Sequence, residues 1–283
     1  MRRASILAAS LMCSVMLFAQ TKESAVLFSG EGTDFSYLLA EKVSVILDES
    51  GNALICLDGA DETGFTLDEN FPVTAEFKDA YKLTANQDLN NTDNYYSTFY
   101  TSEGAYKLPD DGSVKAYIGI TGKYGEADVL NLTPTDTIHA GEAVILRVRP
   151  ANTAGKQTEI TLMPSCNRRA ASEDNKLTGT DVAIAALGAN DYALTLGQNG
   201  VGFYNWDGRA LGAHKAYLTL SGSQPAPLRS FGFRFDDGTV TGIPATTVSG
   251  GPQDDIIYNL QGLRVDGSYK GVVIKNGQKV YNY

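Results

Sequence analysis

The side chains that most often perform catalysis or bind metal ions are sparse in this sequence. Its two histidines, His139 and His214, each lie close to Ala and Gly just before a run with strand character. A general base or a metal ligand needs partner groups that converge on it. The motifs HExxH, CxxC and GxSxG and the glycine-rich phosphate loop are all missing from the chain. We therefore expect a non-catalytic protein with no metal and no cofactor.

Carboxylates are abundant, and two pairs of them lie in turn sequences. Asp110 and Asp111 belong to PDDGS, and Asp236 and Asp237 belong to FDDGT. In such turns the Asp side chain accepts hydrogen bonds from nearby backbone, and Gly adopts a positive φ. A glycan hydrolase needs only two carboxyl groups about 5 to 10 Å apart in space. A secreted hydrolase with an unrecognised carboxylate pair is therefore the alternative to a binding protein.

One polar stretch has spacings loosely similar to those of a calcium-binding loop. In DLNNTDN, residues 88–94, the oxygen-bearing side chains are Asp88, Asn90 and Asp93. The stretch lacks the Gly at about position 6 and the Glu at about position 12 that a calcium loop uses. We interpret it as part of a solvated linker.

The segment GVGFYNWDGR, residues 200–209, holds the strongest candidate binding residues. Tyr204, Trp206 and Arg209 crowd one predicted hairpin. Aromatic rings flanked by an arginine are typical of contacts with glycans or proteins. The alternative is that strand alternation buries Phe203 and that Trp206 caps the edge of the core.

These candidates must be positioned by β-strands. Short apolar runs such as FSYLLA, VSVILD, SVKAYIGI and KAYLTL are separated by clusters of Gly, Asn, Asp and Ser. This spacing of turn residues predicts antiparallel hairpins. The fold class that we expect is all-β, built from antiparallel meander or sandwich modules that follow an N-terminal signal peptide.

The composition also predicts how the chain is divided. The predicted parts are a signal peptide (1–19), an N-terminal β meander (20–83), a linker (84–94), a central β module (95–243), a second linker (244–255) and a C-terminal β-hairpin segment (256–283). The central module has two similar halves, because IHAGEAVIL (138–146) and LGAHKAYL (211–218) share an Ala, two further residues, a second Ala and an apolar run.

The N-terminus has the charge and hydropathy pattern of a secretory signal peptide. Arg2 and Arg3 precede an apolar run that ends near Phe18 and is too short for a permanent membrane span. We expect cleavage near Ala19 and no transmembrane segment.

Removing the first 19 residues leaves about 264 of the 283 residues and changes the net charge from −10 to about −12, because two arginines are lost. An acidic surface disfavours nucleic acid, which needs Lys and Arg to replace its counterions. Only Cys56 and Cys166 remain after processing. A disulfide requires Cα atoms within about 7 Å, so the sequence leaves their pairing open.

Three stretches resemble secreted and cell-surface proteins of the Bacteroidetes, such as those of Bacteroides and Prevotella. The stretch from AVLFSGEG to TAEFKD (25–79) is similar to their N-terminal β segment. The motifs GVGFYNW, KAYL and FRFDDGTVTGI resemble a module found near the C-termini of many of their surface proteins. The ending, IYNLQGLRV followed by KGVVIKNGQKV, resembles the last part of a type IX secretion sorting domain.

The signal peptide predicts export by the Sec machinery, and the resemblance of the tail implies type IX secretion. The expected location is the cell surface, the outer membrane or the medium, with the periplasm as an alternative. The tail departs from the family pattern, because only residues 256–283 follow the linker and the chain ends in VYNY. These residues are therefore either a sorting signal or strands that complete the preceding fold. The same resemblance extends to DTIHA (136–140), which is similar to an O-glycosylation motif with Thr137 as the acceptor.

The function that we expect is binding of a glycan or protein ligand by an exported, adhesin-like protein. Besides the hydrolase, the second alternative is a structural subunit of a surface assembly, because many edge strands can accept a strand from a neighbour.

Overall fold

The computed structural model describes most of the chain from Gln20 onwards. The described residues are 20–30, 33–41, 43–47, 53–57, 60–65, 74–88, 90–124, 127–151, 155–166, 169–197, 200–220, 230–241, 257–259, 264–265, 271–275 and 278–282. The predicted signal peptide (1–19) and the predicted linker 244–255 lie outside these residues. By its internal contacts the chain divides into two compact units, residues 1–244 and 245–283.

The described residues are almost entirely β-structure, so the expected all-β fold is confirmed. The strands of the first unit are β1 (Thr21–Gly30), β2 (Thr33–Leu38), β3 (Ser44–Leu47), β4 (Ala53–Leu57), β5 (Ala60–Phe65), β6 (Thr74–Asp88), β7 (Asn91–Phe99), β8 (Ala105–Lys107), β9 (Val114–Tyr124), β10 (Ala127–Thr135), β11 (Thr137–Ile138), β12 (Val144–Val148), β13 (Gln157–Ser165), β14 (Leu177–Thr180), β15 (Asp191–Gly197), β16 (Gly200–Asn205), β17 (Lys215–Thr219), β18 (Ser230–Arg234) and β19 (Val240–Thr241). One 3-10 turn, η1 (Leu39–Glu41), follows β2.

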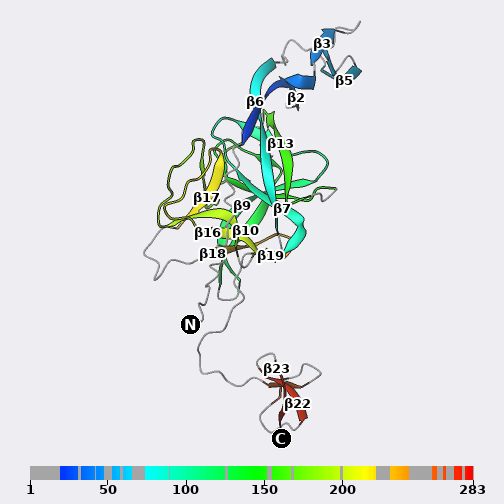
Figure 1. Cartoon of the computed structure of the whole chain (residues 1–283). Helices are drawn as coiled ribbons and strands as arrows, with labels where there is room; N and C mark the ends of the chain where they lie inside the picture. The colour runs from blue at the N-terminus through cyan, green and yellow to red at the C-terminus, as the bar shows by residue number, and fades with distance from the viewer. Residues whose placement is uncertain are drawn as a thin grey trace, which may run out of the picture. The chain divides into compact units, whose positions relative to one another are not determined.

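Most of these strands belong to one large sheet (Figure 1). Its order is β11-β8-β13-β6-β7-β12-β9-β10-β18-β16-β15-β17-β14. The described pairings in it are antiparallel except for that of β10 with β18, which joins the two halves of the predicted central module. The sheet also folds back on itself, because the backbone N–H of Ala216 in β17 donates to the hydroxyl of Thr98 in β7 over 3.2 Å.

Folding the sheet in this way creates two apolar cores. The first combines aromatic residues of both halves, among them Tyr96 and Tyr117 from the first half and Phe203 and Phe233 from the second. The second core packs residues of β6, β7, β12 and β13 around Tyr81 and Phe99, whose ring centroids are 5.0 Å apart. Burial of such rings contributes about 1.5–3 kcal/mol each to folding, so the two cores hold the loops at the sheet ends in place.

The strand β6 corrects the predicted domain boundary. Residues 84–94, predicted to be a linker, form the end of β6 and the beginning of β7, and these two strands pair as a hairpin. The polar residues alternate with buried Leu83 and Ala85, so they mark one face of a strand rather than a solvated segment. Its first half pairs with β1 and its second half with β13, so β6 runs continuously from the predicted meander into the central module.

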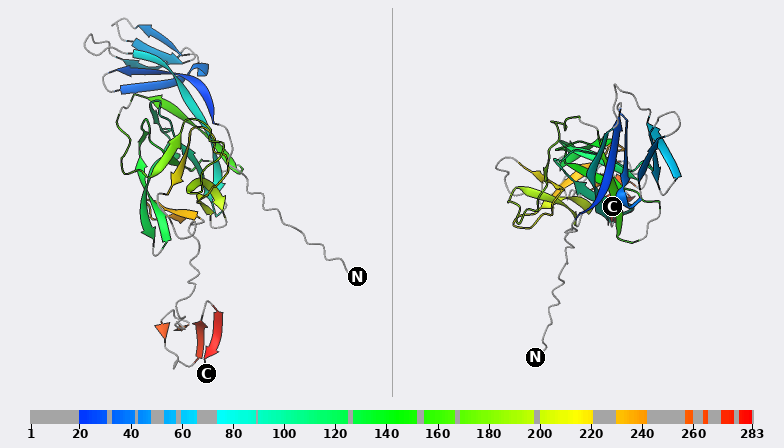
Figure 2. Two further views of the ribbon diagram at one scale, coloured as in Figure 1. Left: turned by 90° about the vertical axis from the view of Figure 1, so that its left-hand side faces the viewer. Right: turned by 90° about the horizontal axis from the view of Figure 1, so that it is seen from above.

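The N-terminal strands form a smaller sandwich. The sheet β3-β4-β5 and the β1-β2 pair belong to the N-terminal strands that Figure 2 shows in blue. Ile55 of β4 packs against Val26 and Phe28 of β1. Covering one face of the β1-β2 pair in this way supplies the partner sheet that a short meander needs for stability.

The two similar halves share a backbone feature. In the matching segments, Ala140 to Ala143 and Ala213 to Ala216, the second residue has a left-handed conformation: φ is 78° at Gly141 and 54° at His214. The residue after it is charged and buried in both cases, Glu142 at 3% and Lys215 at 8% exposure. The same turn thus leads into β12 in one half and into β17 in the other.

The second unit contains β20 (Ile257–Asn259), β21 (Arg264–Val265), β22 (Gly271–Lys275) and β23 (Gln278–Asn282). They form one antiparallel sheet with the order β21-β20-β22-β23. Lys275 pairs with Gln278, so β22 and β23 form an antiparallel hairpin. The described C-terminal strands therefore pair with one another.

Candidate functional site

Two neighbouring grooves flank the loop of residues 108–113. The first, here called the β2 groove, has a volume of about 490 Å³ and lies between this loop, β2 and β13. The second, the β10 groove, has a volume of about 450 Å³ and lies between the loop, the start of β9 and the end of β10. Leu108, Pro109 and Asp110 line both grooves, so one loop connects them.

The loop is fixed by strand pairing and by its own turn. The preceding strand β8 pairs with both β11 and β13. Within the loop the backbone N–H of Ser113 donates to Asp111 over 2.9 Å, and Gly112 has a φ of 71°. Hydrogen bonds from the hydroxyl and backbone N–H of Ser113 lower the pKa of Asp111. Asp111 therefore acts as the turn residue that the sequence predicts and lines the β2 groove, whereas Asp110 lines both grooves.

The grooves carry an excess of negative charge. Asp110, Asp136 and Asp236 surround the β10 groove with one lysine, Lys115. The β2 groove adds Asp111 and Glu159 with one lysine of its own, and it also has the half-buried rings of Phe35 and Tyr37. These carboxylates come from four separate loops and strands. The sequence draws attention to Asp110, Asp111 and Asp236 as turn residues, but nothing in the spacing of the five carboxylates indicates that they meet.

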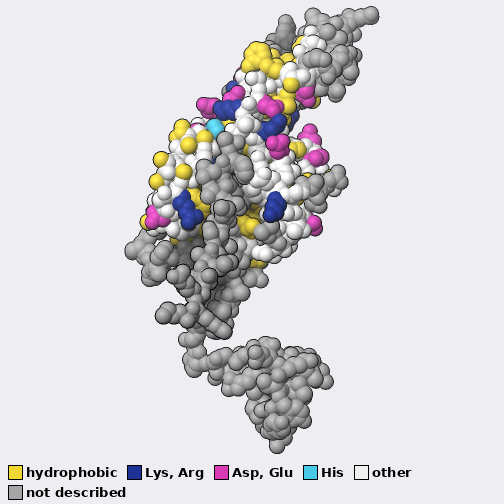
Figure 3. Space-filling view, in the orientation of Figure 1, with side chains coloured by type: hydrophobic (Ala, Val, Ile, Leu, Met, Phe, Trp, Pro, Cys, Tyr) yellow, Lys and Arg dark blue, Asp and Glu magenta, His cyan; other side chains and the backbone are white. Residues whose placement is uncertain are grey.

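The acidic charge of the grooves contrasts with the surface around β1 and β6. There Lys22 pairs with Asp79 over 2.9 Å and Lys82 pairs with Glu23 over 2.6 Å. Figure 3 shows acidic and basic side chains mixed over this part of the surface. Among the described residues, Asp110, Asp136 and Asp236 have no such ion pair. Their charge is therefore available to a ligand.

The second predicted Asp pair has two different roles. Asp236 lines the β10 groove. Asp237 forms an ion pair of 3.0 Å with Arg147, which is 2% exposed and lies over the ring of Phe235 at 4.3 Å. Hydrogen bonds from Thr239, supported by the Arg147 charge, lower the pKa of Asp237 to about 2. Asp237 thus compensates a buried arginine, which a plain turn interpretation did not predict.

The predicted binding hairpin around Trp206 is largely structural. Trp206 is 4% exposed, packs against Leu187 and Ala193, and donates its indole N–H to the carbonyl oxygen of Ala210 over 3.0 Å. Its ring is therefore not available for stacking on a ligand, and the alternative of a capped core edge describes it better. Arg209 is exposed and lies 4.8 Å from the Trp206 ring, while Tyr204 is half-buried.

Neither histidine lies between a serine hydroxyl and a carboxylate among the described residues. His139 is 8% exposed, and its backbone N–H donates to Glu142 over 3.3 Å. His214 lies 3.4 Å from a carboxylate oxygen of Asp181, and Ser102 donates its hydroxyl to the other oxygen over 2.6 Å. A serine nucleophile needs histidine between itself and the carboxylate, but here the carboxylate lies in the middle. The three residues instead connect the loop after β7 to the turn before β17.

The described residues include most of the stretch with calcium-loop-like spacing and the predicted modification site. They contain no cluster of three or more His, Cys, Asp or Glu side chains suited to a metal ion. Asp88 is 2% exposed and accepts the backbone N–H of Asn90 over 2.9 Å, so it closes a turn. Thr137 is half-buried in β11, directly after the groove residue Asp136. Its glycosylation stays a prediction.

The fold and the site define an all-β protein with paired, shallow, acidic grooves. No protein-family model, no curated protein and no solved structure matches the chain. In the part of the chain that the structure describes, no helix has the length and apolar character needed to span a membrane.

Proposed function

We propose that this chain is an exported, non-catalytic binding protein of the bacterial surface or medium, and that its ligand is a protein segment with basic side chains held in the β2 and β10 grooves. The observation that carries the proposal is the shared loop: Asp110 lines two grooves of about 490 and 450 Å³ at once. Each volume is in the range of about 300–1,000 Å³ that is typical of ligand sites.

The charge balance favours a basic partner. Five carboxylates and two lysines line the two grooves together. A surface with one sign of charge attracts the opposite charge and increases the rate of association. The rings of Phe35 and Tyr37 add apolar area on the wall of the β2 groove, which suits the methylene chains of Lys and Arg.

The proposal is tested with a variant that neutralises the β10 groove. The triple substitution Asp110→Asn, Asp136→Asn and Asp236→Asn removes three charges without changing side-chain size. The matched control replaces three exposed acidic residues that lie outside both grooves: Asp93→Asn, Glu173→Gln and Asp174→Asn. Both variants have the same net charge.

Binding is measured on arrays of basic, acidic and neutral peptides and on a glycan array, at low and at physiological salt. We expect the wild type and the control variant to bind basic peptides with an affinity that falls as the salt concentration rises. The affinity of the groove variant for these peptides should be at least tenfold lower. Equal loss in both triple variants would mean that only net charge matters. Selective glycan binding that survives the groove substitutions would overturn the proposal.

One specific observation favours a second candidate, the glycan hydrolase. Three carboxylates, Asp110, Asp136 and Asp236, surround the same β10 groove. All three are exposed, whereas a general acid is usually made by burial that raises its pKa. Release of reducing ends from a polysaccharide by the wild type, and its loss in the groove variant, would favour the hydrolase over the binding protein.

Export and the role of the C-terminal unit are part of the proposal. Intact-mass analysis of the protein from cell fractions and medium of its host maps both ends of the chain. A chain that begins near Gln20 and stops before residue 256, found outside the cell, supports a cleaved sorting signal. Retention of Met1 in a cytoplasmic fraction would contradict export.

A further inference from the structure

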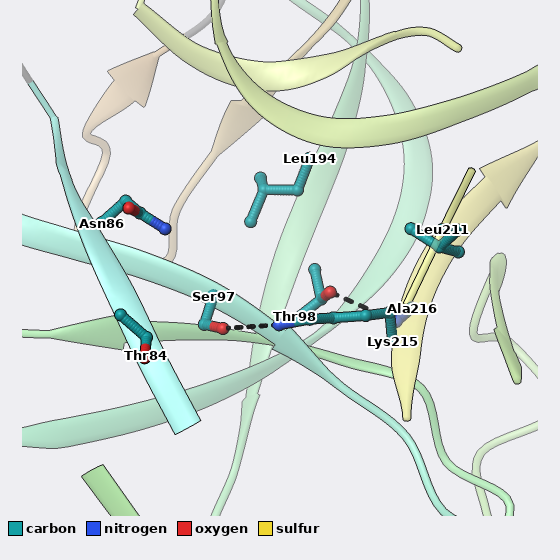
Figure 4. Close-up of a pocket in the computed structure, with 8 residues that line it drawn as sticks. All are labelled: Thr84, Asn86, Ser97, Thr98, Leu194, Leu211, Lys215 and Ala216. Carbon is teal, nitrogen blue, oxygen red and sulfur yellow. Dashed lines mark hydrogen bonds between the residues drawn. The ribbon is translucent and has the colours of Figure 1, made fainter. Parts of the chain in front are cut away.

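The most unusual charge in the described fold is the ammonium group of Lys215. The residue lies in β17, is 8% exposed, and extends its side chain toward β7 (Figure 4). Its Nζ makes one long hydrogen bond, 3.4 Å to the hydroxyl of Ser97. An ammonium has three hydrogens to donate. Among the described residues, no carboxylate forms an ion pair with it.

The Lys215 side chain lines a small cavity between β6, β7 and β17. The cavity has a volume of about 30 Å³. A single water needs about 10–15 Å³, so there is room for two water-sized particles or one somewhat larger ion. The polar part of the lining consists of the hydroxyls of Thr84, Ser97 and Thr98 and the side-chain amide of Asn86. Each of these groups is able to donate a hydrogen bond.

The lining provides no negative charge. Among the described residues that line it, Lys215 is the only titratable one, and the remaining residues are apolar: Leu194, Leu211 and Ala216. The preceding residue, His214, is engaged elsewhere, with its ring 4.7 Å from that of Tyr81 and its Nδ1 3.4 Å from Asp181. The cavity thus combines one cation with several neutral donors, which is the chemistry of an anion site.

The free-energy cost of burying the Lys215 ammonium group without a counter-charge also favours an anion in the cavity. Burial lowers the pKa of Lys215 to about 8, so the ammonium form still predominates at pH 7. A buried charge without a counter-charge is strongly destabilising. Water in the cavity would offer dipoles, whereas an anion would also neutralise the charge.

We propose that the cavity between β6, β7 and β17 binds a small monovalent anion of about the size of chloride, held by Lys215 and the surrounding hydroxyl groups. This site is separate from the acidic grooves, and it does not depend on the function proposed for them. Binding there ties β17 of the second half to β6 and β7 of the first, at the place where the sheet folds back on itself.

The first experiment measures unfolding by urea at pH 6.5 in sodium chloride and in sodium gluconate at equal ionic strength. Gluconate is too large for the cavity. We expect chloride to stabilise the wild type, with the ratio of folded to unfolded protein rising about elevenfold at a chloride concentration ten times the Kd. Lys215→Met should show no chloride effect, and the control Lys78→Met, which removes an exposed lysine paired with Glu76, should retain it.

Two further measurements do not depend on the folding of a variant. In the wild type the chloride effect should disappear at pH 9.5, where the amine is neutral. Crystals grown in sodium bromide should show an anomalous scattering peak within hydrogen-bond distance of Nζ. Water alone in the cavity of bromide-grown crystals, or a chloride effect that persists unchanged at pH 9.5, would overturn the proposal.

Discussion

Replacing Lys215 by Met should make the protein more stable at neutral pH and should remove one part of its pH dependence. Burial lowers the pKa of Lys215 from 10.5 to about 8. At about 1.4 kcal/mol per pH unit, this shift corresponds to about 3 kcal/mol of lost stability below pH 8. The methionine side chain has a similar length and no charge, so it avoids that cost while it still fills the space.

The sign of the pH effect follows from proton binding. Between pH 8 and pH 10.5 the unfolded chain keeps the lysine proton that the folded protein has already lost. The free energy of unfolding must therefore rise with pH in this range. Tyrosine sets the upper limit, because burial raises the pKa of Tyr117 to about 12 and that of Tyr96 still further. Above about pH 10 the unfolded chain loses tyrosine protons that the folded protein retains, which lowers stability.

The assay is urea unfolding of the wild type and Lys215→Met in gluconate buffer from pH 7 to pH 10. We expect the wild type to gain about 2 kcal/mol relative to the variant between pH 8 and pH 10. Cysteine titration contributes equally to both proteins and cancels in the difference. Parallel stability profiles for the two proteins would refute the assigned burial of the charge.

Three further predictions concern stability. Asp237→Asn should lower the free energy of unfolding by about 1–2 kcal/mol, because it leaves the buried Arg147 unpaired. The loss should be smaller than for a fully buried ion pair, because Asp237 is 39% exposed. The control Asp236→Asn should change the free energy of unfolding by less than about 0.5 kcal/mol. The Asp237 contribution should also fade as pH falls from about 4 to 2, since its folded pKa is about 2, and acid titrations of the wild type and Asp237→Asn check this. Trp206→Ala should lose about 3–5 kcal/mol in urea unfolding; a loss below about 1 kcal/mol would mean that the ring is not a core residue. His214→Gly should be about 1 kcal/mol more stable than His214→Ala, because the φ of 54° suits glycine; the reverse order would contradict the left-handed backbone.

The all-β fold was predictable because its signals are local. Apolar runs such as SVKAYIGI and turn residues such as those of PDDGS act within a few residues, and both correspond to described strands and turns. The predicted linker 84–94 was wrong for a physical reason. A strand in the middle of a sheet can be polar along one face, and only the partners of this segment, β13 and β7, reveal that it is paired.

Long-range pairing accounts for the rest of what the sequence did not show. The parallel contact of β10 with β18 joins residues about a hundred positions apart, for example Leu130 with Phe233. No local pattern specifies such a pair. The acidic grooves depend on the same packing, because Asp110, Asp136 and Asp236 come from different loops. For Trp206 the sequence predicted a binding surface with a core edge as the alternative, and the structure favours the core edge. The two could not be told apart, because an aromatic residue beside an arginine has the same sequence pattern in both places.

The two halves of the fold offer the strongest argument for a ligand from outside the chain at Lys215. At the matching position of the first half, the carboxylate of Glu142 is also buried, but its two oxygens accept the backbone N–H groups of His139 and Ser172 over 3.3 and 3.2 Å. The first half therefore satisfies its buried charge with its own backbone. Lys215 occupies the same turn with the opposite charge, and among the described residues its Nζ has only the 3.4 Å contact to Ser97. Since backbone N–H groups cannot accept a hydrogen bond from an ammonium, the second half needs a different acceptor, and the adjoining cavity has the size and the donors to hold an anion in that role.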